Sequence, residues 1–382
     1  RREVKRMRNK NVWSACLGAA LIVLGVISPE TAAGAGVVRR ATFKEELSIG
    51  VKTGDPRYMF GGRIFIGVDD TGAIYVSDYD REGIQKYDAA GSFVMTIGRS
   101  GQGPGEFERT REPRFDAAGN LYVTDIQKGA IIFFDRTGRY MKTITLKTAV
   151  FDVTMMPDGR MAGMQSGTNM VNGKPPELIS IYGLFDASGH CLAEFSRNVF
   201  VMPPPPPKHY SKAESLANRM RDALTPQSFM AVSGDGRIYF GNSAGYKIEV
   251  YSAAGRKLQT IARDIPMAPL GNRDIEVLAE ARFSGEPAEL RREAIKVGGF
   301  PAVKPAFRHL APLEDGGLAV VADIAGKDLA LIDRFDEAGK FVERVEAAIP
   351  YKNLILRNGK AYAVKTDDEG YNYVMRYSYS WK

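Results

Sequence analysis

The chain has 382 residues, of which 44% are apolar and 25% are charged, proportions that are ordinary for a globular protein with a sizeable core. Its net charge is +7, but residues 1–35 alone contain six Lys or Arg and two Asp or Glu, so the N-terminal end holds more than half of the excess. The rest has no cluster of Lys and Arg of the kind that marks a nucleic-acid-binding surface, and we expect no nucleic-acid partner.

Residues 1–35 have the pattern of a secretory signal peptide. A basic segment, Arg1–Lys10, precedes an apolar run at 12–27, and small residues follow at 31–36. The apolar run is shorter than the about 20 residues that a membrane-spanning helix needs. We therefore expect cleavage near Ala35, no stable membrane span afterwards, and a periplasmic, outer-surface or extracellular location in a bacterium. An uncleaved anchor is the alternative.

Residues 64–107 contain four short apolar runs separated by turn signals. Turns such as Asp69–Gly72 and Asp88–Gly91 combine a Gly that allows positive φ with an Asp that can bond its own backbone. Four strands of about five residues joined in this way predict one antiparallel sheet.

The pattern repeats along the chain. Gly72 and Gly119 occupy matching turns 47 residues apart, and so do Gly91 and Gly138. Looser copies of the two turns bring the number of units to six. A repeat of about 40–50 residues with four strands is the signature of a β-propeller. The sequence therefore predicts an all-β fold, a six-bladed β-propeller of four-stranded antiparallel blades, as a single domain over residues 36–382.

The segment Gly98–Phe107, which reads GRSGQGPGEF, and the strand pattern after it resemble bacterial six-bladed propellers of the NHL-repeat type. The resemblance is specific over residues 64–145 and diffuse over 146–377. It implies the propeller fold, but this architecture serves binding modules, lactonases and lyases alike, so it implies no single function.

The last blade runs out of chain after Trp381. Residues 43–49, which alternate weakly between apolar and polar, are expected to supply its outer strand and close the ring. Closure removes open sheet edges that would otherwise invite aggregation.

Two inserts interrupt the repeat, at about 196–225 and 267–299. The first contains five prolines and a capping-box pattern, Ser211 with Glu214, that predicts a short helix; the second has two stretches of helical spacing separated by Pro287. In a four-stranded blade the links between blades leave from one face, so both inserts lie over the same mouth of the central channel. Either they form a recognition surface or they cover blade edges.

We place the candidate ligand-binding or partner-binding residues on the same face, in the loops that follow each second strand: Asp78, Arg81, Asp125, Lys128, Asn242, Tyr246, Asp323 and Lys327. The oxygen-bearing members could hold a divalent cation such as calcium, with Asp78, Asp125, Asn242 and Asp323 as weak candidate ligands. The alternative is that each Asp accepts hydrogen bonds from the backbone of its own loop.

The sequence gives little support to catalysis. Its three histidines, His190, His209 and His309, are scattered, which does not favour a His-rich zinc site. No catalytic residue and no cofactor is assigned, and enzymatic activity is left open but disfavoured. The leading hypothesis is an exported, monomeric binding or assembly module for a protein partner or a small polar ligand. The alternatives are a divalent-metal hydrolase or lactonase and a scaffold for extracytoplasmic redox proteins.

Overall fold

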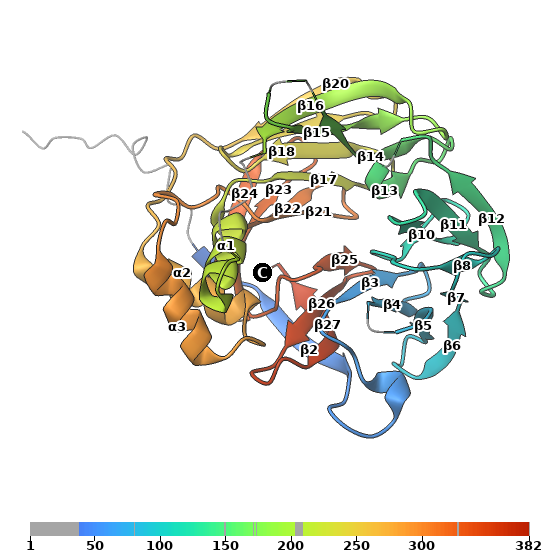
Figure 1. The fold of residues 1–382 in the computed structure, drawn as a ribbon, viewed down its shortest axis with the longest axis horizontal. Coiled ribbons are helices and arrows are strands. Elements are labelled where there is room, and N and C mark those ends of the chain that lie inside the picture. Colours follow the sequence, from blue (N-terminus) through green and yellow to red (C-terminus); the bar gives the residue numbers. More distant parts are fainter. Residues whose placement is uncertain are drawn as a thin grey trace, which may run out of the picture. The chain divides into compact units, whose positions relative to one another are not determined.

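Six antiparallel sheets surround a central axis as the blades of a propeller in the computed structural model (Figure 1). The structure describes residues 38–381 except 80, 149, 171, 173, 203–208 and 327. All of them belong to one compact unit, Gly36–Lys382. The predicted signal peptide lies outside the described residues.

Each of the first four blades is a meander of four consecutive strands. Blade 1 contains β3 (Ile64–Val68), β4 (Ile74–Asp78), β5 (Ile84–Tyr87) and β6 (Phe93–Ile97). Blade 2 contains β9 (Arg114–Phe115), β10 (Leu121–Asp125), β11 (Ala130–Phe134) and β12 (Tyr140–Thr145). Blade 3 contains β13 (Val150–Met155), β14 (Met161–Asn169), β15 (Glu177–Phe185) and β16 (Cys191–Val201). Blade 4 contains β17 (Ser228–Val232), β18 (Ile238–Asn242), β19 (Lys247–Tyr251) and β20 (Lys257–Ala262).

The last two blades use strands from both ends of the chain. Blade 5 contains β21 (His309–Pro312), β22 (Leu318–Gly326), β23 (Leu329–Phe335) and β24 (Phe341–Ala347), and β1 (Val38–Arg40) adds a parallel fifth strand to β24. Blade 6 contains β25 (Ile355–Arg357), β26 (Lys360–Thr366), β27 (Asn372–Ser380) and, outermost, β2 (Thr42–Ile49). The six-bladed architecture is confirmed, whereas the fifth strand of blade 5 was not predicted.

Apolar layers between neighbouring blades hold the ring together. Ile74 and Tyr87 of blade 1 pack with Tyr362 of blade 6, and Tyr75 on the opposite face of blade 1 packs with Leu121 of blade 2. Because both faces of a blade are covered, the inner strands are continuously buried, while the outer β6 alternates between partly buried and exposed residues.

The tight turns form as their Asp-x-x-Gly patterns predict. Oδ1 of Asp69 accepts hydrogen bonds from the backbone N–H groups of Thr71 (2.9 Å) and Ala73 (3.0 Å). Gly72 in the same turn has a φ of 82°, a conformation that other residues adopt only with strain.

The inserts contain three helices: α1 (Lys212–Leu224), α2 (Asn272–Arg282) and α3 (Ala288–Val297). The predicted capping box is present, since the Ser211 side chain accepts from the N–H of Glu214 and the Glu214 side chain accepts from the N–H of Ser211. The predicted start of the first insert at 196 is wrong, because β16 continues to Val201. Among the helices of the described residues, none has the length and apolarity that crossing a membrane requires.

Two shorter strands and one helical turn complete the elements. The strands are β7 (Arg99–Ser100) and β8 (Glu106–Phe107), which pair in parallel within the Gly-rich link, and the turn is the 3-10 helix η2 (Pro56–Tyr58).

The pairing of β2 with β27 confirms the predicted ring closure, with Thr42 opposite Ser380 and Ile49 opposite Val374. We predict that deleting residues 1–49 lowers the free energy of unfolding by about 3–5 kcal/mol, because Ile49 and its neighbours leave the layer between blades 6 and 1. Deleting only residues 1–41 removes β1 but keeps β2 and serves as the control. Urea denaturation measures both, and equal losses would show that β2 does not close the ring.

Candidate functional site

The two faces of the ring differ in what they carry. The turn face holds the tight turns between first and second and between third and fourth strands, such as Asp69–Gly72. The insert face holds the loops between second and third strands, the links between blades, and α1–α3. The described structure therefore confirms that the two inserts leave from one face.

The central channel contains a cavity of about 1020 Å³. The innermost strands line it, together with turns of the turn face such as those at Asp70, Gly119 and Asn358, and no residue of α1–α3 does. Of the eight residues predicted to bind a ligand or partner, the seven that the structure describes do not line this cavity. The volume is sufficient for a small-molecule ligand.

Polar side chains link neighbouring blades along the cavity wall. Arg114 of blade 2 donates to the Oγ1 of Thr154 in blade 3 (2.5 Å), and the Tyr122 hydroxyl accepts from the N–H of Met155 (2.9 Å). His309 of blade 5 donates from Nε2 to the carbonyl oxygen of Leu354 in blade 6 (2.9 Å). These contacts connect blade 2 to blade 3 and blade 5 to blade 6 along the wall.

The environment of His309 favours the neutral imidazole. Burial lowers its pKa, the hydrogen bond to the Leu354 carbonyl opposes this shift, and the nearby Arg114 guanidinium lowers the pKa further. Because Nε2 donates to a carbonyl oxygen, the neutral tautomer carries its hydrogen there, and Nδ1 is left as an acceptor.

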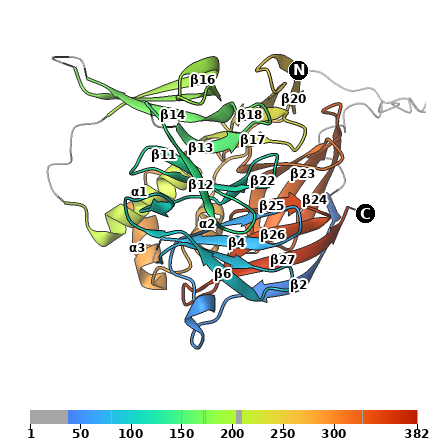
Figure 2. The same cartoon turned by 90° about the vertical axis from the view of Figure 1, so that its right-hand side faces the viewer.

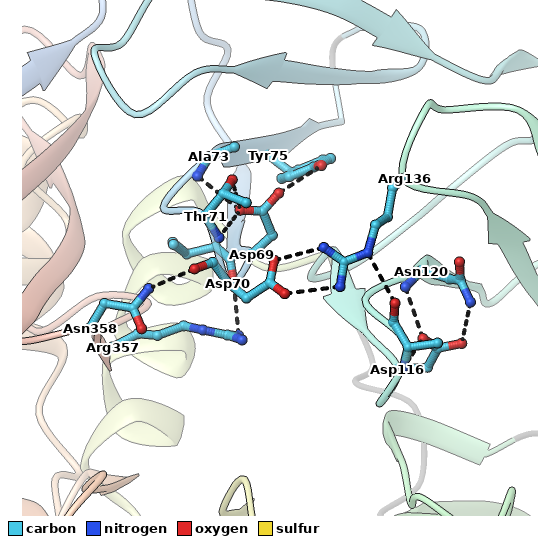
Figure 3. Close-up of polar contacts among 12 residues, drawn as sticks. Asp69, Asp70, Thr71, Ala73, Tyr75, Asp116, Asn120, Arg136, Arg357 and Asn358 are labelled. Carbon is cyan, nitrogen blue, oxygen red and sulfur yellow. Dashed lines mark hydrogen bonds and ion pairs between the residues drawn. The ribbon is translucent and has the colours of Figure 1, made fainter.

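Charged turns on the turn face, which we call the rim, lie beside the cavity, and Figure 3 shows the contacts among their side chains. Arg136 of blade 2 makes a bidentate contact with Asp70 of blade 1 (2.9 and 3.1 Å), and Asn358 of blade 6 donates to the carbonyl oxygen of Asp70 (3.3 Å). The Arg136 guanidinium holds the pKa of Asp70 below its usual range. The rim thus joins blades 6, 1 and 2, but these exposed contacts contribute little to stability.

The candidate ligand-binding residues of blades 1 and 2, Asp78 and Asp125, accept hydrogen bonds from the backbone. Asp78 Oδ2 accepts from the N–H of Gly61 (2.8 Å). Asp125 is fully buried and accepts from the N–H groups of Glu108 (2.8 Å), Gln127 (2.9 Å) and Lys128 (3.2 Å). These contacts support the alternative interpretation, in which each Asp caps the loop and link of its own blade.

The other predicted residues do not converge either. Arg81 donates to the Pro56 carbonyl oxygen, and Lys128 donates to that of Glu106 (2.7 Å). Asn242 accepts from the N–H of Ala244 (2.9 Å), and the buried Tyr246 donates to Asp333 (2.6 Å).

Asp323 accepts from Lys304 (2.8 Å) and lies 3.7 Å from Arg308, while Lys327 lies outside the described residues. Among the residues that the structure describes, no group of three or more His, Cys, Asp or Glu is placed to hold a metal ion. The four candidate calcium ligands are therefore not brought together as one site.

A feature that the sequence analysis missed is a protruding part of blade 3, which we call the flap. It consists of the outer ends of β14, β15 and β16: Gly167–Asn169, Glu177–Ile179 and Val199–Val201. Figure 2 shows it on the same side of the ring as the three helices. Its strands are longer than those of blade 1: the outer strand β16 has 11 residues, whereas β6, the outer strand of blade 1, has five.

The flap exposes apolar side chains on both of its faces. Leu178 and Phe200 are opposite each other on one face, and Ile179 and Val199 are opposite each other on the other. The exposed fractions reach 58% for Phe200 and 53% for Val201. The sequence does contain an indication of the flap, the apolar end of residues 195–202 (FSRNVFVM). The same apolar run, however, also fits a buried strand or part of an insert.

Comparison with known proteins confirms the fold and leaves the function open. A family model described as a 6-bladed beta-propeller matches residues 66–170. No curated protein matches the sequence. The NHL-repeat type suggested by the sequence is not part of this match, so the resemblance stands at the level of the six-bladed propeller.

Solved structures with this fold have diverse descriptions. A candidate exported protein from Bacteroides fragilis is 11% identical, with a TM-score of 0.53, over 91% of this chain and 97% of its own. Virginiamycin B lyase from Staphylococcus aureus is 12% identical, with a TM-score of 0.43, over 88% of this chain and 99% of its own. A gluconolactonase from Xanthomonas campestris is 10% identical, with a TM-score of 0.39, over 88% of this chain and 99% of its own. At these identities the similarity shows the fold alone.

We predict that Asp125→Ala lowers the free energy of unfolding by about 2–3 kcal/mol, because three backbone N–H groups lose a charged acceptor inside the protein. Asp125→Asn, which keeps one oxygen acceptor, should lose less. Urea denaturation measures the loss, and calcium titration of the wild-type protein checks the competing role. A calcium-dependent rise in Tm that disappears in Asp125→Ala would restore the metal-ligand interpretation.

The lowered pKa of His309 predicts a dependence of stability on pH. In the unfolded chain the pKa of His309 is 6.5, so below pH 6.5 the unfolded chain binds a proton that the folded state does not. The stability that His309 contributes is therefore present above pH 6.5 and is lost as the pH falls. One such group changes the free energy of unfolding by at most about 1.4 kcal/mol per pH unit. His309→Gln, which retains a donor, should reduce the slope between pH 6.5 and 5.5 in urea denaturation. His190→Gln is the control, and equal slopes in both variants would contradict the prediction.

Proposed function

We propose that this protein is an exported β-propeller that binds a protein partner through its insert face and acts as a binding or assembly module in the bacterial envelope. The observation that supports this function best is the exposed apolar surface of the flap. Single exposed apolar residues are normal on a protein surface, but a contiguous group indicates an interaction site. Export is inferred from the signal-peptide pattern of residues 1–35.

The flap also offers backbone groups to a partner. In blade 3 the strand order is β13-β14-β15-β16, so β16 is the edge strand, and within the described residues no further strand pairs with its outer side. An extended segment of a partner can add to such an edge through main-chain hydrogen bonds while its side chains contact Val199 and Phe200. The partner class that fits is therefore a protein with an extended apolar segment.

The alternatives from the sequence have weaker grounds. The metal-dependent hydrolase lacks a supporting group of three or more His, Cys, Asp or Glu side chains in the described part of the chain. The helices of the inserts are also less suited to recognition than the flap. Leu216, Met220 and Leu224 of α1 are fully buried against α2 and Ile324 of blade 5.

Trimming the first insert would therefore not be a clean test of recognition, because removing α1 exposes this apolar cluster. Point substitutions in the flap avoid the problem, since exposed positions away from the core usually change stability by less than about 0.5 kcal/mol.

We predict that Phe200→Ser combined with Val201→Ser reduces partner capture from native envelope extracts at least roughly tenfold, because central apolar contacts dominate interface affinity. Leu258→Ser on β20 is the matched control, since Leu258 is 47% exposed but lies in blade 4. Thermal melts should be unchanged in both variants. Undiminished capture by the flap variant, or equal loss with Leu258→Ser, would refute the proposal. Concentration-dependent sedimentation of the wild type alone would identify a second copy of the chain as the partner.

A further inference from the structure

Several cationic side chains lie at the insert-face end of the channel, in the links that lead into the innermost strands. Arg63 precedes β3 of blade 1, Arg111 precedes β9 of blade 2, Arg308 precedes β21 of blade 5, and Lys352 lies just before β25 of blade 6. Arg282, the last residue of α2, adds a cation from the second insert. Equivalent positions in successive blades surround one axis, so the fold gathers charges that are far apart in the sequence.

Hydrogen bonds place Lys352 beside Arg63. Asn353, the neighbour of Lys352, donates from Nδ2 to the carbonyl oxygen of Ile64 (3.1 Å), and Ile64 follows Arg63 directly. Asn372 of β27 bridges the same two segments, because its Oδ1 accepts from Lys352 Nζ at 3.5 Å and its Nδ2 donates to the Gly61 carbonyl oxygen. The link of blade 6 is thus tied to the link of blade 1.

The second insert reaches the same place. The loop after α2 touches the loop between β26 and β27, since a Cβ built on Gly285 would lie 3.3 Å from the Cα of Gly370. Arg282 is close enough to act on Lys352 electrostatically. Partial burial lowers the pKa of Lys352, and the positive charges of Arg282 and Arg63 lower it further.

Among the described residues, some of these cations have a carboxylate counter-ion and others do not. Arg111 pairs with Asp152 (2.8 Å), and Arg308 lies 3.7 Å from Asp323. No carboxylate among the described residues lies within ion-pair distance of Arg63, Arg282 or Lys352. Arg63 instead stacks on the rings of Phe65 (5.4 Å) and Tyr79 (4.9 Å), which positions its guanidinium without neutralising it.

We propose that Arg63, Arg282 and Lys352 form a binding site for an anionic group, a phosphate or a carboxylate, at the insert-face end of the channel. Lys352 is half-buried, whereas Arg63 and Arg282 are exposed. Like charges held close together repel one another, and a bound anion replaces that repulsion with attraction. Two guanidinium groups supply paired donors that match planar or tetrahedral oxyanions, and the ammonium supplies a compact charge. The site does not depend on the flap or on the partner that the flap binds.

The test is calorimetric titration of the full chain with inorganic phosphate and, separately, with acetate. Saturable binding of at least one anion is expected. Lys352→Gln and Arg63→Gln should each weaken it roughly tenfold, because each removes a charge-assisted hydrogen bond. Arg256→Gln makes the same change of charge at an exposed turn of blade 4 and should leave the affinity unchanged.

Each outcome decides something. Preference for phosphate identifies a phosphate ester as the ligand class, and preference for acetate identifies a carboxylate. Arg282→Gln, at an exposed helix end, provides the same test if Lys352→Gln fails to fold. Absence of saturable binding of either anion, or equal weakening by Arg256→Gln, overturns the proposal. Capture of a partner by the flap should be unaffected by Lys352→Gln, so the two proposals can fail separately.

Discussion

The structure depends on the pairing of β2 with β27, because a propeller is stable only when every blade has a neighbour on both faces. Blades 6 and 1 share an apolar layer that includes Ile49, Tyr87 and Val374, and the closing strand contributes directly to it. This pairing joins β2, near the start of the described chain, to β27, near its end, in one sheet. It therefore fixes the circle of innermost strands, and with it the channel and the positions of every side chain that faces it.

Closure also makes the two ends of the channel physically different. On the turn face the connections are short and their Asp side chains bond the local backbone, as Asp69 does. On the insert face the links vary in length without disturbing the sheets, because longer surface loops cost little additional entropy. The flap, the helices and the cation cluster of Arg63, Arg282 and Lys352 accordingly lie at that end.

The fold was predictable because its signals are local. Turn patterns such as Asp69–Gly72 recur at a constant spacing, the capping box at Ser211 identifies its own helix, and the closing strand follows from a missing partner in the last blade. The site was not predictable for two reasons. An Asp that caps a loop, such as Asp125, has the same sequence pattern as one that binds a ligand. Arg63 and Lys352 are nearly 290 positions apart, and only the closed ring brings them together.

The two interaction features of the insert face rely on different forces, which gives each a distinct dependence on solution conditions. Burial of Phe200 and Val201 by a partner is an apolar effect that salt does not weaken. Attraction of an anion to Arg63, Arg282 and Lys352 is electrostatic, and at physiological ionic strength charges separated by more than about 8 Å are largely screened. The cation cluster therefore acts on a group that enters the channel mouth, whereas the flap acts on a surface that lies against it. A single ligand would need both an apolar strand and an acidic group to use the two together.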